Sequence, residues 1–184
     1  MWGLVCVHYV ILLNNTEISV FFCYNKFGDI MIRRAEEKDI DICIALLKQV
    51  CSVHAKIRPD LFKDGMTKYD SNDLKELFKN DDRPVFVFES DNKVLGYIFC
   101  EIIISNSIVN PKIIKTLYID DLCVDENIRG KHIGKKLYEY VLEFAKSINC
   151  YNVTLNVWEG NDNAKKFYEA CGMSVQKTYM EKIL

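Results

Sequence analysis

The chain has 184 residues, of which 49% are hydrophobic and 27% charged, and this composition is that of one globular domain with a sizeable core. Its formal net charge of −2 gives no electrostatic reason to expect a nucleic acid or a membrane surface as a partner. The eight cysteines form no C-x-x-C pair and no Cys/His ligand spacing, so we interpret them as reduced thiols of a cytoplasmic protein and expect no metal.

The first thirty residues differ from the rest in pattern. The apolar run Met1–Leu13 is shorter than the ~20 residues that span a bilayer, and no Lys or Arg precedes Lys26, as a signal peptide would require. A second apolar run, Ile18–Tyr24, follows Asn14-Asn15, which is compatible with a hairpin. We expect residues 1–30 to be an N-terminal extension or an appended hairpin, and residues 31–184 to form the main domain.

The next segment predicts a strand followed by two helices. Ile30–Arg34 is expected as a short strand, and Asp39 suits the first turn of a helix that runs towards His54. Apolar residues recur in that helix at helical spacing: Ile40, Cys43, Leu47, Val50 and Cys51. Arg58 precedes a proline and therefore leaves the helical region. Ser71 is the expected N-cap of a short second helix.

The remaining segments predict strands with two more helices. Strands are expected at Val85–Glu89, Val94–Ser105, Lys115–Val124, Tyr151–Trp158 and Ser174–Lys182. Helices are expected from about His132 to Ile148, with one apolar face, and again up to Ala170. The fold class is therefore α+β, with a central, mostly antiparallel mixed sheet flanked by helices.

One stretch, KTLYIDDLCVDENIRGKHIG (Lys115–Gly134), has the pattern of an anion site. A strand leads through a Gly-containing turn directly into a helix, whose first N–H groups lack partners and whose dipole is positive there. Phosphates bind at such helix ends, and Arg129, Lys131, Lys135 and Lys136 add positive charge. The stretch predicts a pyrophosphate site, the alternative being a strand–helix connection with a solvated basic rim.

A second stretch, EGNDNAKKFYEACGM, contains Asn161-x-x-Ala164-x-x-Phe167-Tyr168. Together the two stretches resemble the GNAT superfamily of N-acetyltransferases, which transfer an acetyl group from acetyl-CoA to an amine. The turn of that family reads Arg/Gln-x-x-Gly-x-Gly/Ala, and here His132 stands in place of its first glycine. The resemblance covers residues 32–184 in element order and is specific from Tyr118 to Met173.

The resemblance implies how acetyl-CoA would be held. The turn would bind the pyrophosphate, and its residues are Arg129, Gly130, Lys131, His132, Ile133, Gly134 and Lys135. The backbone of Leu122, Cys123 and Val124 would pair with the pantetheine arm, where the central strand splays from the next strand at the acyl-CoA site. Asn161 would hydrogen-bond the cofactor arm, or it would cap the following helix.

The resemblance also implies catalytic residues. Tyr168 is the candidate acid, because a phenol near ~10 can protonate a leaving thiolate near ~8.5; the alternative is simple packing beside Phe167. Strand alternation would put Asp120 and Asp121 on opposite faces. Their strand looks like that of spermidine/spermine and glucosamine-phosphate acetyltransferases, which implies that Asp120 assists deprotonation of the amine, and we assign Asp121 to the acceptor.

By the same resemblance the acceptor pocket is lined by His54, Arg58 and Phe62. His54 suits a base at neutral pH, or it is only a helix-end or core histidine. The sequence thus predicts an acetyl-CoA-dependent N-acetyltransferase, without a metal, that acts on a primary amine, with a small polyamine or amino sugar favoured. Alternatives are a protein N-terminus or lysine as acceptor, or a non-catalytic acyl-CoA-binding or regulatory module. A small-molecule or peptide amine is the expected partner, together with a second copy in a homodimer.

Overall fold

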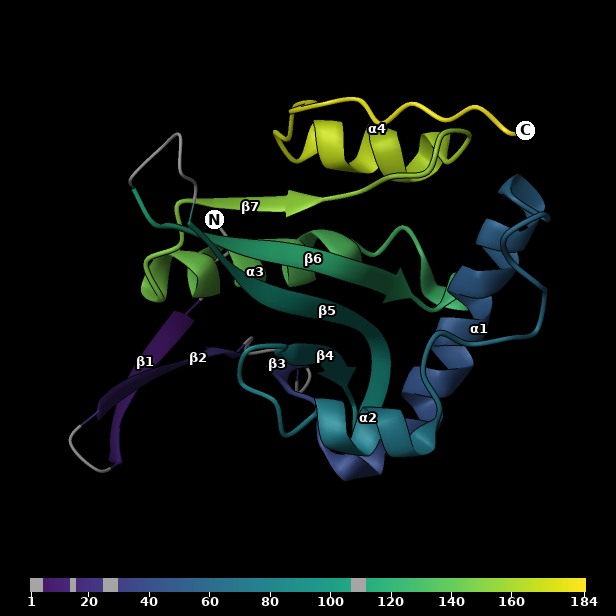
Figure 1. The fold of residues 1–184 in the computed structure, drawn as a ribbon. Coiled ribbons are helices and arrows are strands. Elements are labelled where there is room, and N and C mark those ends of the chain that lie inside the picture. The colour runs from purple at the N-terminus through teal and green to yellow at the C-terminus, as the bar shows by residue number, and fades with distance from the viewer. Residues whose placement is uncertain (1–4, 14–15, 25–29, 107–111) are drawn as a thin grey trace.

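The computed structural model describes residues 5–13, 16–24, 30–106 and 112–184. Its centre is a mixed sheet with the strand order β3-β4-β5-β6-β7, flanked by helices (Figure 1). Neighbouring strands are antiparallel except β6 and β7, which are parallel. The strands are β3 (Ile30–Arg34), β4 (Val85–Ser90), β5 (Lys93–Ser105), β6 (Ile114–Val124) and β7 (Asn152–Leu155). The predicted α+β class is confirmed.

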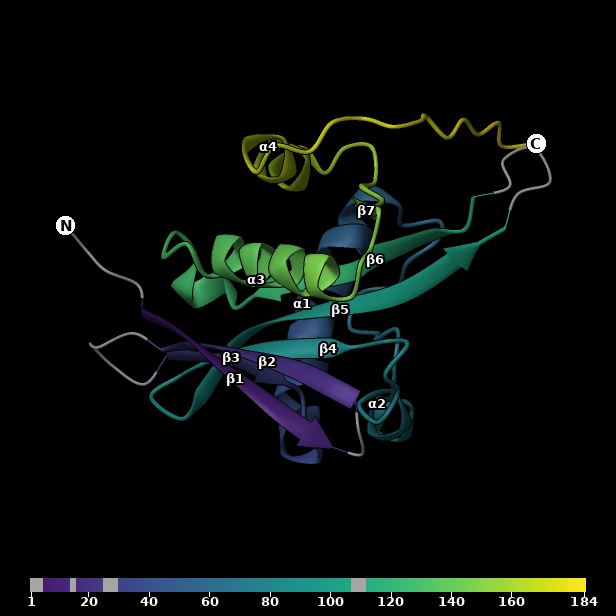
Figure 2. The same ribbon diagram turned by 90° about the vertical axis from the view of Figure 1, so that its left-hand side faces the viewer.

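Each face of the sheet has its own core. Helices α1 (Ile40–Ile57) and α2 (Ser71–Leu77) pack on one face, whereas α3 (Ile133–Ser147) and α4 (Asp162–Ala170) pack on the other (Figure 2). Side chains of β4 alternate between the two: Val85 and Val87 join the α1/α2 core, Phe86 and Phe88 the α3 core. None of the helices in the described ranges is long and apolar enough to cross a membrane.

One predicted helix cap differs from the structure. Asp70, not Ser71, is the N-cap of α2, because its carboxylate accepts hydrogen bonds from the backbone N–H groups of Asn72 and Asp73. Asp39 lies at the N-cap position of α1, in agreement with the sequence, but its carboxylate makes no cap hydrogen bond there. It is buried and accepts two hydrogen bonds from the Arg33 guanidinium, at 2.6 and 2.9 Å, so it is needed to neutralise a buried charge.

A bulge interrupts the pairing of β6 with β5. Phe99 lies opposite Asp121 and Cys100 lies opposite Ile119, so Asp120 is an extra residue between two pairs. The extra residue shifts the alternation, and both carboxylates contact groups of the α1/α2 face: Asp120 the hydroxyl of Tyr69, and Asp121 that of Tyr97. The expectation that Asp120 and Asp121 lie on opposite faces was therefore wrong.

The pairing of β6 with β7 ends at the level of this bulge. The last pair is Ile119 with Leu155, whereas β6 continues to Val124, paired on its other side with β5. Figure 1 shows β6 and β7 diverging beyond this point. The stretch Asp120–Val124 thus has a backbone edge without a strand partner among the described residues. This divergence is the predicted splay of the central strand.

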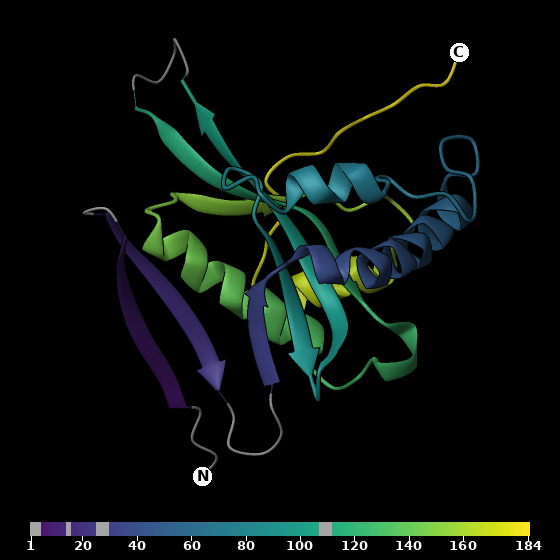
Figure 3. The same cartoon turned by 90° about the horizontal axis from the view of Figure 1, so that it is seen from below.

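The two ends of the chain lie outside this sheet. Strands β1 (Val5–Leu13) and β2 (Thr16–Tyr24) pair antiparallel as a separate two-stranded sheet, at the β3 side of the molecule (Figure 3). Asn14-Asn15, the predicted turn, lies outside the described residues. The predicted strand Ser174–Lys182 is not formed. Residues 174–184 are exposed and non-regular, and none of the described strands pairs with their backbone groups.

Candidate active site

The turn between β6 and α3 has two residues in the left-handed backbone region. Gly130 has φ +83°, and His132, the N-cap of α3, has φ 60° and ψ 17°. Left-handed backbone is uncommon outside glycine, but histidine is among the side chains that adopt it more often than most. His132 therefore follows the backbone path that a glycine would take, and the departure from the Gly pattern leaves the shape of the turn intact.

The start of α3 fits an anion. No acidic residue lies in its first turn, where the N–H groups lack intrahelical partners. Arg129, Lys131, His132 and Lys135 are exposed around it, whereas Ile133 is buried in the core and offers only its backbone. An added Cβ on Gly134 would meet Phe167 at 3.5 Å and Leu122 at 3.6 Å, so this glycine faces α4 and β6 and not the solvent.

The unpaired edge of β6 offers backbone groups and not side chains. The side chain of Cys123 is buried in the α1/α2 core and that of Leu122 packs against the α3 core, as does that of Val124. Because these side chains are used in packing, the N–H and C=O groups on the β7 side are what remains for a ligand. An extended arm that adds to the edge as a short strand fits this arrangement.

Tyr168 of α4 lies near this edge. Its ring packs edge-on against Phe167 and Tyr138, with ring centroids 5.0 and 6.1 Å apart. Burial and, second, the negative charge of Asp121 raise the pKa of Tyr168, so it keeps its proton at neutral pH. Asp121 thus influences the phenol of α4 electrostatically, and a shared role of these two residues in one site stays a prediction.

Asn161 caps α4. Its Oδ1 accepts a hydrogen bond from the backbone N–H of Ala164 at 3.3 Å. The helix cap was one of the two roles that the sequence allowed for Asn161. A contact between Asn161 and the cofactor arm stays a prediction.

Asp120 accepts hydrogen bonds from two groups outside its strand, the Lys68 ammonium and the Tyr69 hydroxyl. The Lys68 Nζ donates to both carboxylate oxygens of Asp120, at 2.5 and 2.7 Å, and the Tyr69 hydroxyl donates to Oδ2 at 3.1 Å. The Tyr69 hydroxyl in turn accepts from the Arg83 guanidinium at 2.7 Å, and its ring stacks on Phe99. Sequence reasoning missed Lys68 and Tyr69, because no local pattern links them to a strand some fifty residues away.

Asp121 has a different environment. Its carboxylate accepts a hydrogen bond from the Tyr97 hydroxyl at 2.9 Å. Burial raises the pKa of Asp121 to about 6; the Tyr97 hydrogen bond acts in the opposite direction, and the neighbouring negative charge of Asp120 adds to the rise. The two carboxylates are thus distinct: one is ion-paired with Lys68, and the other is ready to take up a proton near neutral pH.

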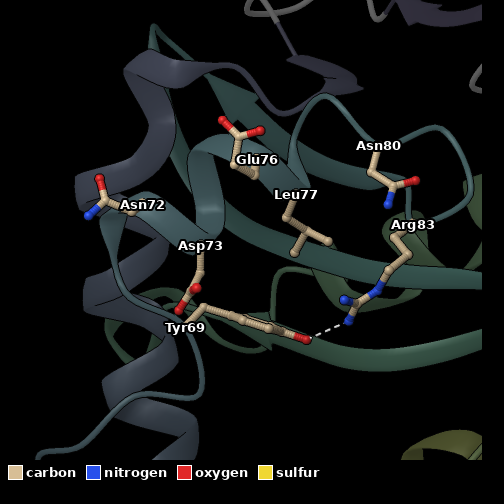
Figure 4. Close-up of a pocket in the computed structure, with 7 residues that line it drawn as sticks. All are labelled: Tyr69, Asn72, Asp73, Glu76, Leu77, Asn80 and Arg83. Atoms are coloured by element: carbon tan, nitrogen blue, oxygen red, sulfur yellow. Dashed lines mark hydrogen bonds between the residues drawn. The ribbon is translucent and has the colours of Figure 1, made fainter.

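A pocket of about 390 Å³ lies beside this network, on the outer side of α2 (Figure 4). The pocket meets the acid site only at Tyr69 and Arg83, which are hydrogen-bonded to each other. The residues that line it are Tyr69, Asn72, Asp73, Glu76, Leu77, Asn80 and Arg83. None of these residues belongs to β6 or to the turn before α3. In the described ranges no three His, Cys, Asp or Glu side chains are grouped as metal ligands.

The predicted acceptor residues form an aromatic cluster at the end of α1. The rings of His54 and Phe62 are 5.1 Å apart, and Phe62 meets Trp158 edge-on at 5.5 Å. The Arg58 guanidinium lies over the Trp158 ring at 5.6 Å. Asp121, which the sequence also assigned to the acceptor, is hydrogen-bonded to Tyr97 and is not part of this cluster. Sequence reasoning assigned Trp158 to the end of the predicted strand Tyr151–Trp158 and missed its place in this cluster, beyond the end of β7.

Charges around this cluster are largely compensated. Arg58 pairs with Asp60 at 2.7 Å and with Glu181 of the C-terminal segment at 2.9 Å. Burial lowers the pKa of His54, which is therefore neutral at pH 7. The cluster thus combines a neutral imidazole with aromatic faces, and its role in binding an acceptor stays a prediction.

Comparison with known proteins adds three findings. The model of the "Acetyltransferase (GNAT) family" matches residues 47–173. A glucosamine 6-phosphate N-acetyltransferase of Arabidopsis thaliana is 43% identical over 68 residues, 37% of this chain and 44% of the relative. An uncharacterized N-acetyltransferase of Archaeoglobus fulgidus is 32% identical over 143 residues, 74% of this chain and 88% of the relative. The matched stretch spans under half the length of the Arabidopsis relative and of one from Methanocaldococcus jannaschii, at 44% and 42%.

Solved structures share the fold. The crystal structure of a variant of a Bacillus halodurans protein is 31% identical, covers 83% of this chain and 98% of its own, and superposes with a TM-score of 0.79. An aminoglycoside N-acetyltransferase in complex with CoA is 12% identical, covers 86% of this chain and 97% of its own, and has a TM-score of 0.63. The second likeness is one of fold alone.

Proposed function

The chain belongs to the GNAT family of acetyltransferases, and from that membership we propose that it transfers the acetyl group of acetyl-CoA to a primary amine. Acetyl-CoA would supply the acetyl group as a thioester. The described residues fit it in two places: the basic, left-handed turn before α3 suits its phosphates, and the unpaired edge of Asp120–Val124 suits its extended arm.

Two groups of the chain would manage the protons. Tyr168 holds a proton at neutral pH and can donate it to a departing thiolate, but burial raises its pKa and so makes it a weaker acid than a free phenol. Asp120 has the harder task, because a carboxylate is a much weaker base than an amine, so direct proton transfer from an ammonium to a carboxylate is strongly uphill. We therefore propose that Asp120 attracts the ammonium and passes its proton on to water, as part of a pair with Asp121.

One observation carries the choice of acceptor. The bulge puts the carboxylates of Asp120 and Asp121 on one face, at the level where the partnerless edge of β6 begins. Two acids beside the acyl site favour a small cationic amine, since they attract the ammonium. Two curated relatives support an amino sugar: they are glucosamine 6-phosphate N-acetyltransferases, from Arabidopsis thaliana and Dictyostelium discoideum. A polyamine or an amino sugar is the proposed acceptor class.

Release of the CoA thiol tests this function. The purified chain is incubated with acetyl-CoA and, in parallel, with spermidine, glucosamine 6-phosphate, a lysine peptide or no amine. We expect thiol release with at least one small amine and an acetylated product of matching mass. Release with the peptide alone would overturn the acceptor class. Binding of acetyl-CoA without transfer to any amine would favour the non-catalytic module instead.

The Asp120→Asn variant separates the two roles of that acid. If Asp120 only attracts the amine, KM for the amine rises and kcat is kept, whereas loss of a proton relay lowers kcat. We expect a lower kcat at pH 7 that is partly restored at pH 9, where more of the amine is uncharged. A wild-type kcat from pH 7 to 9 would contradict the relay.

A further inference from the structure

The amine group of Lys68 lies where the amine of an acceptor would have to lie. Its Nζ donates to both oxygens of Asp120, at 2.5 and 2.7 Å, and Asp120 is the acid to which the proposed reaction delivers the ammonium. From this geometry, which rests on the proposed function, we propose that Lys68 is itself an acetyl acceptor and that the enzyme acetylates its own Lys68.

The position of Lys68 in the chain allows the approach. It belongs to the segment between α1 and α2, where residues 58–70 form neither helix nor strand. Its side chain is 53% exposed, whereas that of Asp120 is 12% exposed. A half-exposed ammonium that reaches down to a nearly buried carboxylate is free to leave it and to return, as the amine of a substrate would.

The surroundings hold an alkylammonium in place. The Tyr69 ring lies 5.3 Å from the Lys68 Nζ, and the Tyr69 hydroxyl binds the same carboxylate oxygen. Tyr69 is fixed in turn by its stacking on Phe99 and by Arg83. The Asp120 carboxylate and the Tyr69 ring therefore hold the Lys68 ammonium at one position, and such positioning raises the effective concentration of a nucleophile by orders of magnitude.

Protonation sets the rate of this reaction. Burial pulls the pKa of Lys68 down, but the hydrogen bond and the charge of Asp120 outweigh it and raise that pKa above its ordinary value. Lys68 is thus an ammonium at rest, and it must lose a proton to Asp120 or to water before it reacts. The self-acetylation is therefore expected to be slow at pH 7 and faster as the pH rises.

The step balances as an ordinary acyl transfer. The Lys68 Nζ, after it has lost one proton, forms a bond to the acetyl carbon while the C–S bond of the thioester breaks. The nitrogen loses a second proton as the amide forms, and the departing sulfur gains one from Tyr168 or from solvent. The products are N-acetyl-lysine at position 68, free CoA and one proton. Lys68 loses its positive charge, so its ion pair with Asp120 is lost.

A mass-spectrometric experiment tests the proposal. The full chain is incubated with acetyl-CoA but without any amine, and peptides are quantified over time at pH 7 and pH 9. Lys75 is the internal control, since its Nζ is also paired with a carboxylate, at 2.6 Å, but that carboxylate belongs to Glu37 and not to the acid pair of β6. We expect Lys68 to gain one acetyl group at least tenfold faster than Lys75, at a fractional rate independent of protein concentration.

Variants keep the test decisive. Lys68→Arg should retain the fold and show no acetylation at position 68. Tyr168→Phe, in which Lys68 is unchanged, should be acetylated at Lys68 more slowly than the wild type. Equal rates at Lys68 and Lys75, or a rate that scales with protein concentration, would overturn the proposal. If small amines are turned over while Lys68 stays unmodified, the self-acetylation alone is wrong. If neither reaction occurs although acetyl-CoA binds, the proposed function has failed.

Discussion

Single residues in this site differ in what they contribute: some by chemistry, others by conformation. Tyr168 and Asp121 have pKa values shifted upwards by burial, whereas His132 matters through its left-handed backbone. Predictions at this scale follow from one side chain at a time.

Tyr168→Phe removes only a hydroxyl and keeps the ring that packs on Tyr138. If the hydroxyl protonates the leaving thiolate, turnover should fall by the ~10²–10⁴-fold that is typical of acid–base roles, while acetyl-CoA affinity is nearly unchanged. Steady-state kinetics together with calorimetry of acetyl-CoA binding measure both. A variant that keeps more than about a third of wild-type turnover would show that Tyr168 only packs.

His132→Gly should stabilise the protein. A non-glycine residue with φ 60° destabilises the folded state by roughly 1–2 kcal/mol, and glycine would remove this strain. Glycine also makes the unfolded chain more flexible, which offsets part of the gain in stability. We expect a gain of about 1 kcal/mol, or about 2–4 °C in the melting temperature. The matched control is Gly130→Ala, which adds a left-handed alanine in open space and should lower the melting temperature. A loss of stability in His132→Gly would contradict the strain.

Asp121 should make stability depend on pH. Its pKa rises from 3.8 in the unfolded chain to about 6 in the folded one, so the folded state binds the proton more tightly. This stabilisation is complete below about pH 4 and is lost as the pH rises through about 6, by about 3 kcal/mol at 1.36 per unit. Asp121→Asn, which keeps an acceptor for Tyr97, lacks this loss.

The comparison uses the free energy of unfolding in urea for both proteins at pH 4.5 and pH 7.5. The free energy of unfolding of Asp121→Asn, relative to that of the wild type, should be larger at pH 7.5 than at pH 4.5. Parallel pH profiles would mean that Asp121 titrates normally.

Elements position the site through their ends and their edges. The end of β6 and the start of α3 supply the candidate phosphate turn, and the divergence of β6 from β7 supplies an open backbone edge. Gly134→Glu, which the sequence would suggest as a test beside the phosphates, is unsuitable, because its Cβ would contact the apolar side chains of Phe167 and Leu122, so a loss of packing would be confused with a loss of phosphate binding.

Arg129→Ala combined with Lys131→Ala is the better test of the turn, since both side chains are exposed and the change removes two charges and one long hydrogen bond, from Arg129 Nε to the Val124 carbonyl oxygen at 3.5 Å. Acetyl-CoA at 100 times its Kd should stabilise the wild type by about 2.7 kcal/mol, and NAD and ATP much less. The double variant should need several-fold more acetyl-CoA for the same shift in melting temperature. Lys146→Ala, at the other end of α3, is the control. No shift of the wild type with acetyl-CoA would contradict the cofactor assignment.

At the scale of the whole molecule, one sheet with two cores carries the site, and both ends of the chain lie apart from that sheet. The N-terminal hairpin forms its own two-stranded sheet, and residues 174–184 are exposed throughout. The described site residues all lie between His54 and Tyr168, apart from the contact of Arg58 with Glu181. The site is thus expected to survive the loss of the N-terminal segment.

A chain that starts at Met31 should remain folded and bind acetyl-CoA as well as the full chain. The reason is that no strand of the hairpin pairs with β3 to β7. Circular dichroism melting and acetyl-CoA titration of both chains check this. An insoluble or non-binding product would mean that residues 1–30 complete the core.

The sequence by itself determined what depends on neighbours along the chain. Hydrophobic periodicity predicted the strands and helices, since one buried face requires a period of 2 or 3.6 residues. The turn from Arg129 to Gly134 and the start of α3 are contiguous, so their charges and glycines could be recognised locally. The family resemblance rested on the same local patterns, and the family match confirmed it.

Only the tertiary structure decided what depends on partners far away in the chain. The bulge at Asp120 exists in the register between β6 and β5, and it moved two carboxylates to one face against the expected alternation. The ion pair of Asp120 with Lys68 joins residues that share no local pattern. The strand expected at Ser174–Lys182 did not form, because a strand needs a neighbour for its backbone groups and alternating side chains do not supply one.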